Sequence, residues 1–227
     1  DLECVGIMGG EPLMNPRIKD WLHGLRELLP NTQIRLPTNG LLLHKHMDLV
    51  EAMNDIGNCV LKISYHVDNQ RLRSVVKQII NSYDFRPVTE FGINRWSTEN
   101  NFKFQINSPE KFLKSFKNEY TDMLPHNSNP KEAFEACVCQ RCAFLHNGQL
   151  FKCSIAGLTP ELHKRFNSPN DEAWHPYLNT GLSVDCDDKR LEGFVRNFGS
   201  SHAMCRQCPT KHDSDSIIDH KSTILIK

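Results

Sequence analysis

The residues best suited to metal chemistry are cysteines in the second half of the chain. Cys139 and Cys142 are separated by two residues, and Cys205 and Cys208 repeat this C-x2-C spacing. A two-residue gap lets both sulfurs of a tight turn face one metal centre, and thiolates bind Zn²⁺ or an iron–sulfur cluster. Cys153 lies between the two pairs and adds another candidate ligand. By itself, the repeated spacing is typical of a zinc site.

The nine cysteines fall into two groups. Cys4 and Cys59 lie in apolar, strand-like runs, where we expect buried and inert thiols. The other seven lie between residues 137 and 208. An odd number of cysteines without a signal peptide argues against a disulfide framework and predicts a metal in a reducing, cytoplasmic compartment. Cys186 is either an extra ligand or a plain buried thiol, and we favour the latter.

A second set of candidate residues follows a strand-like run at residues 4–8. The segment consists of Gly9, Gly10, Glu11 and Pro12. Glycines let the polar groups of a ligand approach the backbone, and a carboxylate can hold an ammonium group by a charge-assisted hydrogen bond. Taken alone, the segment is better explained as an ordinary turn between a strand and a helix.

Polar side chains also follow the later strand-like runs. Thr38 and Asn39 come after the second run, and Ser64 and His66 end the third. Because side chains alternate along a strand, Ser64 and His66 can share a face. Asn94, at the end of a further strand, is a weaker candidate. Individually, an Asn-Gly turn and a structural histidine explain these residues better than a ligand does.

Strands and helices alternate in the part of the chain that must position these residues. Short apolar runs predict strands at residues 4–8, 33–37, 59–66, 88–96 and 102–106. Apolar residues at helical spacing predict helices at residues 18–29, 47–56 and 72–83, and a further helix is expected at about 109–120. This alternation predicts βα units and a parallel sheet, whose functional loops lie at the carboxyl ends of the strands.

The chain divides into four regions by composition. We expect an α/β region at residues 1–124, a Pro/Asn/Ser-rich linker at 125–136, a cysteine-rich region at 137–213 and a tail at 214–227. Residues 144–151 read as a hairpin, because Asn147-Gly148 supplies positive φ at the turn. A helix is expected near residues 189–198.

Composition excludes two classes of protein. The formal net charge is zero, so a strongly basic nucleic-acid surface is not expected. Hydrophobic residues make up 39% of the chain, but no run approaches the ~18 apolar residues that a membrane span needs.

The combined strand-end motifs resemble the radical S-adenosylmethionine (SAM) superfamily. In that family, the Gly-Gly-Glu segment binds the amino group of the methionine part of SAM. The resemblance implies this role for Gly9, Gly10 and Glu11, with Pro12 at the turn. It covers roughly residues 4–106 and implies a partial (β/α) barrel with parallel strands.

The resemblance also implies SAM contacts on later strands. In the family, a polar residue at the end of a later strand, often Ser, contacts the SAM carboxylate or ribose, and Ser64 is in the matching place. Thr38 and Asn39 look like the residues of the second loop. His66 and Asn94 are further candidates for the SAM pocket.

The cysteine-rich region resembles the SPASM/twitch appendages of radical SAM enzymes, which carry auxiliary [4Fe–4S] clusters. A Gly148-x4-Cys153 hairpin followed by a C-x2-C pair matches residue by residue at three cysteines, Cys153, Cys205 and Cys208. The fourth ligand stays open among Cys137, Cys142 and Cys139, in that order of preference. No cysteine follows Cys208, as in the shorter, one-cluster twitch type.

The catalytic [4Fe–4S] cluster of the family is bound by three cysteines that precede the Gly-Gly-Glu strand. Cys4 lies inside that strand, so we expect this motif upstream of Asp1, in a longer protein. The resemblance then implies an enzyme that uses a 5′-deoxyadenosyl radical to abstract hydrogen. Its substrate would be a peptide or protein, with a small molecule as the alternative, and flavodoxin or ferredoxin would donate electrons.

Two other readings of the sequence stay open. A zinc-stabilised, non-catalytic binding module would explain the two C-x2-C pairs but leaves the strand-end motifs without a role. A degenerate radical SAM fold that binds a partner would lack the three upstream cysteines.

Overall fold

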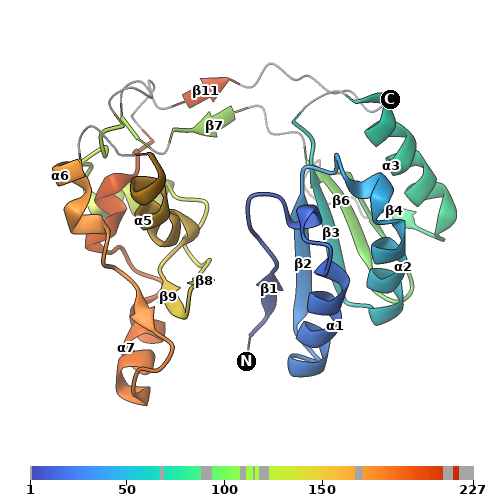
Figure 1. Ribbon diagram of the computed structural model, residues 1–227, viewed down its shortest axis with the longest axis horizontal. Coiled ribbons are helices and arrows are strands. Elements are labelled where there is room, and N and C mark those ends of the chain that lie inside the picture. The colour runs from blue at the N-terminus through green and yellow to red at the C-terminus, as the bar shows by residue number, and fades with distance from the viewer. Residues whose placement is uncertain are drawn as a thin grey trace. The chain divides into compact units, whose positions relative to one another are not determined.

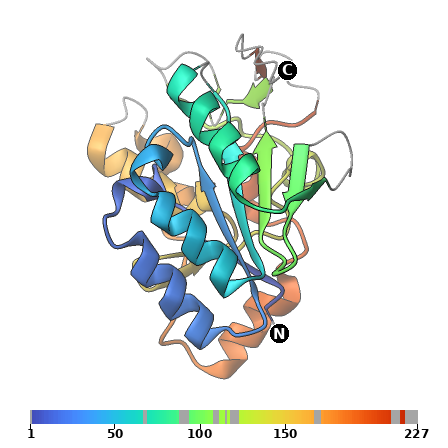
Figure 2. The same ribbon diagram turned by 90° about the vertical axis from the view of Figure 1, so that its right-hand side faces the viewer.

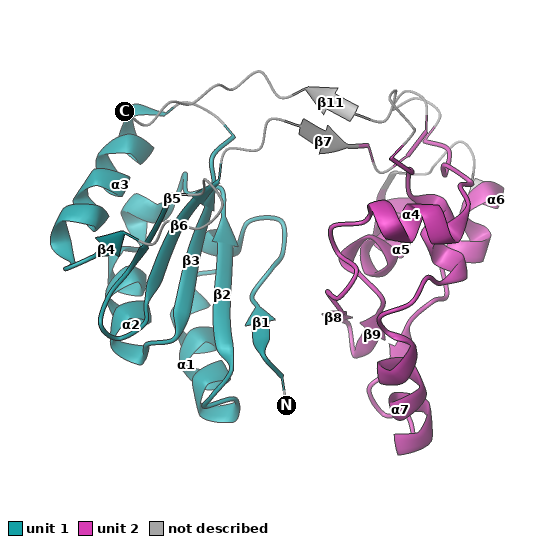
Figure 3. Cartoon of the chain, turned by 180° about the vertical axis from the view of Figure 1, so that it is seen from behind, with its two compact units in different colours: residues 1–110, 220–227 teal, residues 111–219 magenta. Residues whose placement is uncertain are grey.

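Helices and strands alternate through the first half of the chain in the computed structural model (Figure 1). The structure describes residues 2–66, 69–87, 94–107, 111–114, 116–117, 123–166, 171–211 and 217–219. Contacts divide the chain into two units: unit 1 is residues 1–110 with 220–227, and unit 2 is residues 111–219 (Figure 3).

Unit 1 contains a six-stranded sheet with the order β1-β2-β3-β6-β5-β4. The strands are β1 (Cys4–Gly6), β2 (Gln33–Thr38), β3 (Cys59–Ser64), β4 (Arg86–Pro87), β5 (Asn94–Ser97) and β6 (Lys103–Asn107). The pairs β1–β2, β2–β3 and β3–β6 are parallel. The predicted α/β class with a mainly parallel sheet is therefore confirmed.

Three helices cover one face of this sheet, and they lie in front of the strands in Figure 2. They are α1 (Ile18–Leu28), α2 (Met47–Ile56) and α3 (Gln70–Ser82), with short 3-10 turns η1 (Pro12–Met14) and η2 (Leu43–Lys45). Asn69 begins α3 by accepting a hydrogen bond from the N–H of Leu72, and Gly57 ends α2 with φ of 67°.

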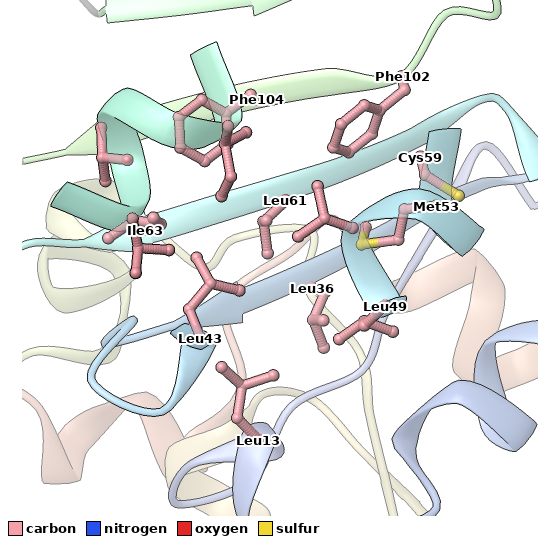
Figure 4. Packing of buried hydrophobic residues seen from close by; sticks show 14 of the residues in the cluster. Leu13, Leu36, Leu43, Leu49, Met53, Cys59, Leu61, Ile63, Phe102 and Phe104 are labelled. Carbon is pink, nitrogen blue, oxygen red and sulfur yellow. The ribbon is translucent and has the colours of Figure 1, made fainter. Parts of the chain in front are cut away.

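The core of unit 1 lies between the helices and the sheet. Alternate strand residues such as Leu36, Leu61 and Phe104 are fully buried against Leu49 and Met53 of α2 and their neighbours (Figure 4). Each such side chain contributes about 1.5–3 kcal/mol through its removal from water. This packing fixes the strands, and so fixes where their carboxyl ends lie.

The prediction of parallel strands is wrong for β5 and β4. β5 runs antiparallel to β6, and β4 runs antiparallel to β5. The reason is the short connection from β5 to β6, in which the N–H of Thr98 bonds to the carbonyl of Phe102 and Asn101 has φ of 58°. A connection this short permits a hairpin, whereas a parallel pair needs a crossover of a dozen or more residues.

Unit 2 contains short elements. They are β7 (Lys111–Leu113), α4 (Pro130–Ala136), β8 (Phe144–His146), β9 (Gln149–Phe151), α5 (Ser154–Phe166), α6 (Asp171–Trp174), η3 (His175–Tyr177), β10 (Leu182–Ser183), α7 (Asp188–Asn197), η4 (Ala203–Gln207) and β11 (Ile217–Asp219). The predicted hairpin is confirmed: β8 pairs antiparallel with β9, and Asn147 and Gly148 have φ of 47° and 70°.

Other expectations for the second half differ from the structure. Residues 111–113, expected in a helix, form β7, which pairs with β11 in the expected tail. The expected linker contains α4, because Asn129 caps its first turn and Pro130 occupies the first helical position. The two units divide at residue 110, ahead of the expected boundary at 124. Among the described residues, no helix is long and apolar enough to cross a membrane.

Candidate functional site

The carboxylate of Glu11 joins the loop after β1 to the loop after β2. Its Oε1 accepts hydrogen bonds from the N–H of Leu13 at 3.0 Å and from the hydroxyl of Thr38 at 2.5 Å. Its Oε2 accepts a hydrogen bond from the N–H of Asn39 at 2.8 Å. The structure therefore brings Glu11, Thr38 and Asn39 together, although they lie on different loops.

One acceptor position of the Glu11 carboxylate remains for another donor. An ionised carboxylate offers about four lone-pair positions, two on each oxygen. The two donors on Oε1 and the single donor on Oε2 leave the free position on Oε2. Glu11 can thus hold the loops in place and still accept one hydrogen bond from an ammonium group.

The second loop is held by its own side chains as well. The N–H of Gly40 donates to the Thr38 hydroxyl at 3.0 Å, and the N–H of Leu41 donates to Oδ1 of Asn39 at 2.9 Å. Gly40 has φ of 74°, and a Cβ there would lie 2.8 Å from Cδ1 of Leu72. Gly40 is therefore required by the fold itself.

Gly9 and Gly10 have no such structural requirement. Both are exposed, and neither has a positive φ. A Cβ added at either position would meet no atom within 4 Å. Glycine here leaves open backbone at the end of β1, which is the arrangement that a closely approaching ligand needs.

The structure places Ser64 at the same edge of the sheet as Thr38 but on the other face. Thr38 pairs with Ile63 in the register of β2 and β3, so these two side chains share the face that the helices cover. Ser64 is the next residue, so it points away from the helices and is half-buried. The structure therefore does not bring Ser64 together with the Glu11–Thr38 pair.

The two remaining candidates lie at this edge with less defined roles. His66 is half-buried and follows the end of β3. Asn94 begins β5 and pairs with Ile106 near the carboxyl end of β6, because β5 is antiparallel. The backbone of Asn94 is therefore at the expected edge, while its side chain lies outside the described part of the chain.

Five cysteines line one pocket in unit 2, and they are Cys137, Cys139, Cys153, Cys205 and Cys208. They come from the end of α4 and the turn after it, the start of α5, and η4 with the residue that follows. Cys208 interacts electrostatically with three of the others, namely Cys137, Cys153 and Cys205. Segments about 70 residues apart in sequence thus supply one cluster of thiols.

Backbone groups are directed at the sulfurs of this pocket. The N–H of Cys139 donates to Sγ of Cys137 at 3.2 Å, and the N–H of His202 donates to Sγ of Cys205 at 3.5 Å. Hydrogen bonds of this kind stabilise a thiolate more than a neutral thiol. At Cys137 the local backbone therefore favours the form of cysteine that binds metals.

Cys153 gains similar support from the start of α5. The nearby backbone N–H groups of Ala156 and Ile155 favour its thiolate and act to lower its pKa. These are among the first N–H groups of the helix, which have no partner within it and carry partial positive charge. Burial nevertheless raises the pKa of the Cys153 thiol above its usual value.

Protonation states in the pocket are unequal. Burial raises the pKa of the Cys208 thiol. A hydrogen bond from the Cys139 thiol lowers the pKa of Cys137, and the same bond raises the pKa of Cys139. A bound metal would replace these protons, because metals bind thiolates.

The second C-x2-C pair is held by a buried glutamine. Gln207 is 1% exposed, and its Oε1 accepts a hydrogen bond from the Thr159 hydroxyl at 3.2 Å. Its carbonyl accepts a hydrogen bond from the N–H of His126 at 3.2 Å. These bonds fix the turn that carries Cys205 and Cys208.

The other cysteines do not line the pocket. Cys142 is exposed, and its N–H donates to the carbonyl of Cys139 at 3.3 Å in a turn. Cys186 is half-buried, and neither residue lines the pocket. Cys59 is fully buried as expected, whereas Cys4 is half-buried. All nine cysteines are free of disulfides.

The pocket does not have the geometry of a single-ion site. Within the described ranges, no group of three or more His, Cys, Asp or Glu side chains is arranged to hold a metal ion. Four thiolates that share one Zn²⁺ lie within about 4 Å of one another, because each Zn–S bond is about 2.3 Å. Five cysteines nevertheless line one pocket.

Two residues of the pocket were not predicted from sequence. Lys152 and Gln207 both line it, and both are almost fully buried. Lysine and glutamine are usually exposed, so residue type gives no signal for burial at either position. Their position next to Cys153, Cys205 and Cys208 was the available signal.

Comparison of the chain with protein-family models and with curated proteins gives no match. Function is therefore inferred from the residues and geometry of the two sites.

We predict that Glu11→Gln destabilises unit 1 by about 1–3 kcal/mol, the cost of a buried donor left without a partner. The NH2 group of glutamine cannot accept a hydrogen bond, so at least one donor to Glu11 loses its acceptor. The fewest hydrogen bonds are lost when the NH2 group faces the N–H of Asn39. Urea denaturation measures the change, and faster amide exchange at residues 38–41 locates it. Glu27→Gln, on the exposed surface of α1, is the matched control and should stay within about 0.5 kcal/mol of wild type. Equal effects of both changes would contradict a bridging role for Glu11.

Proposed function

We propose that this protein is a radical SAM enzyme that binds SAM at the loops after β1 and β2 and an auxiliary [4Fe–4S] cluster in unit 2. The observation that carries the proposal is the pocket where Cys137, Cys153, Cys205 and Cys208 meet. In this proposal the sheet of unit 1 belongs to a partial (β/α) barrel, and unit 2 is a twitch-like domain.

The chemistry of the donor set fits an iron–sulfur cluster. Cluster irons are bound by four cysteine thiolates, which the pocket can supply. Thiolates also bind Zn²⁺, so a zinc-stabilised binding module is the alternative, which iron, sulfide and zinc analysis distinguishes.

Cys137 is the best candidate for the fourth ligand. It lines the pocket, whereas Cys142 is exposed and does not line it. Cys139 also lines the pocket, but its thiol donates to the Cys137 sulfur. We therefore assign Cys137 as the ligand and Cys139 as its hydrogen-bond donor.

The loop after β1 suits the amino group of SAM. The exposed backbone of Gly9 and Gly10 offers carbonyl acceptors, and Glu11 retains one acceptor position on Oε2. Ser64, on the face that the helices leave open, is proposed to contact the SAM carboxylate or ribose. The roles of Thr38 and Asn39 are to orient Glu11 through direct hydrogen bonds.

The cofactors supply the reaction and the protein supplies position and charge. Bound to a reduced catalytic cluster, distinct from the auxiliary cluster, SAM would accept an electron and supply a 5′-deoxyadenosyl radical for hydrogen abstraction from the substrate. We propose a peptide or protein substrate, with a small molecule as the alternative. Flavodoxin or ferredoxin is the proposed electron donor, in a reducing, cytoplasmic compartment that suits nine free thiols.

We predict that Gly10→Ala weakens SAM binding at least tenfold, about 1.4 kcal/mol, in isothermal titration calorimetry. The added methyl group meets no protein atom, so the fold is unaffected and the methyl group occupies ligand space. Gly24→Ala in α1, where a Cβ also meets nothing, is the control and should leave SAM affinity unchanged. Wild-type affinity in Gly10→Ala would exclude SAM from this loop.

We also predict that Cys137→Ser abolishes assembly of the auxiliary cluster, while Cys142→Ser assembles it like wild type. Cys137 lines the pocket and Cys142 does not. Anaerobic reconstitution followed by iron and sulfide analysis measures the difference. The reverse pattern, with the cluster lost only in Cys142→Ser, would show that the ligand assignment is wrong.

A further inference from the structure

Lys152 is a buried cation at the wall of the cysteine pocket. It directly follows β9 and precedes Cys153, and it is 3% exposed. A lysine is almost never fully buried unless its charge is compensated, because removing an ammonium group from water is costly. The structure must therefore provide compensation nearby.

Neutral groups around the ammonium group give only part of this compensation. Nζ donates to the carbonyl of Gln140 at 3.4 Å, and it lies 4.9 Å and 4.5 Å from the ring centroids of Phe134 and Phe198. An ammonium group has three donors, so a single long hydrogen bond and two ring faces leave it incompletely solvated.

Lys152 shares the wall of the pocket with cysteines. Cys137, Cys153 and Cys205 line the same pocket, and Cys153 is the next residue in sequence. Among the described residues, no Asp or Glu carboxylate forms an ion pair with Lys152. The anion that matches this cation is therefore the set of thiolates that would hold a cluster.

We propose that Lys152 is the built-in counter-cation of the cysteine pocket and raises the reduction potential of the auxiliary cluster. The inference rests on the proposed function, since it requires a cluster at these cysteines. Four thiolates outweigh the positive charge of the cluster core, so the ligated cluster is an anion. One-electron reduction by the electron donor adds further negative charge and breaks no bond, so a nearby fixed cation favours the reduced form.

Lys152 is thus a positioning residue, because it acts on the cluster through charge without being a ligand. A purely structural role would consist in holding α4 and the residue that follows α7 through the rings of Phe134 and Phe198. Loss of that role would lower the melting temperature and leave the potential unchanged. The potential therefore distinguishes the two roles.

The test is the midpoint potential of the auxiliary cluster in Lys152→Met, measured by anaerobic redox titration with electron paramagnetic resonance detection. Methionine keeps much of the length of lysine and removes the charge. We expect the one-electron reduction constant to fall at least tenfold, which is about 59 mV. Lys131→Met, which removes an exposed charge from α4, is the matched control and should change the constant less than twofold.

Iron and sulfide analysis separates failure of this inference from failure of the proposed function. A wild-type chain that assembles no cluster would overturn both. An assembled cluster with the same potential in wild type and Lys152→Met would overturn the role of Lys152 alone. Should Lys152→Met fail to hold a cluster, Lys152→Arg keeps the charge and is expected to assemble it. Loss of the cluster in both variants would contradict the inference, because shape and not charge would then be the requirement.

Discussion

The carboxylate of Glu11 is the interaction on which the organisation of the strand-end loops depends. Parallel strands end at one edge of a sheet, so the loops after β1 and β2 must meet there, and their polar backbone groups need partners. The Glu11 carboxylate accepts one hydrogen bond from an N–H on its own loop. It accepts two more from the next loop, one from a hydroxyl and one from an N–H. Since these bonds fix the second loop and shape the first, Gly9 and Gly10 can remain open without loss of order.

A similar constraint governs unit 2, where thiols far apart in sequence are buried together. Backbone N–H groups near the sulfurs favour thiolates, whereas burial raises the pKa of Cys153 and Cys208, and thiolates in one pocket repel one another unless positive charge is present. In our proposal, Lys152 supplies one positive charge at the pocket wall and a metal centre supplies the rest. The hairpin of β8 and β9, the start of α5 and the buried Gln207 all serve to hold this arrangement.

Local signals in the sequence predicted much of the fold. Apolar spacing located α1, α2 and α3. Asn147-Gly148 located the hairpin, because the preference for positive φ at the turn depends only on these two residue types. The direction of β5 depended instead on the short connection before β6, which the alternating pattern concealed. At α4 the signal was present, since Asn129-Pro130 is a cap, but the surrounding polar composition indicated a linker.

The candidate sites were predictable in residue type but not in geometry. Cysteine spacing indicated a metal centre, yet spacing alone could not decide between Cys137 and Cys142, because the choice depends on how α4 approaches η4. The opposite orientations of Thr38 and Ser64 follow from strand register, which one sequence does not reveal.

The most direct test of the central claim is the content of iron, acid-labile sulfide and zinc in this chain, purified without oxygen, together with its absorption spectrum. We predict about four iron and four sulfide per chain, with a broad band near ~400 nm, because four thiolates of the pocket bind one [4Fe–4S] cluster. About one zinc per chain without sulfide would contradict this account, since the pocket would then be a structural zinc site.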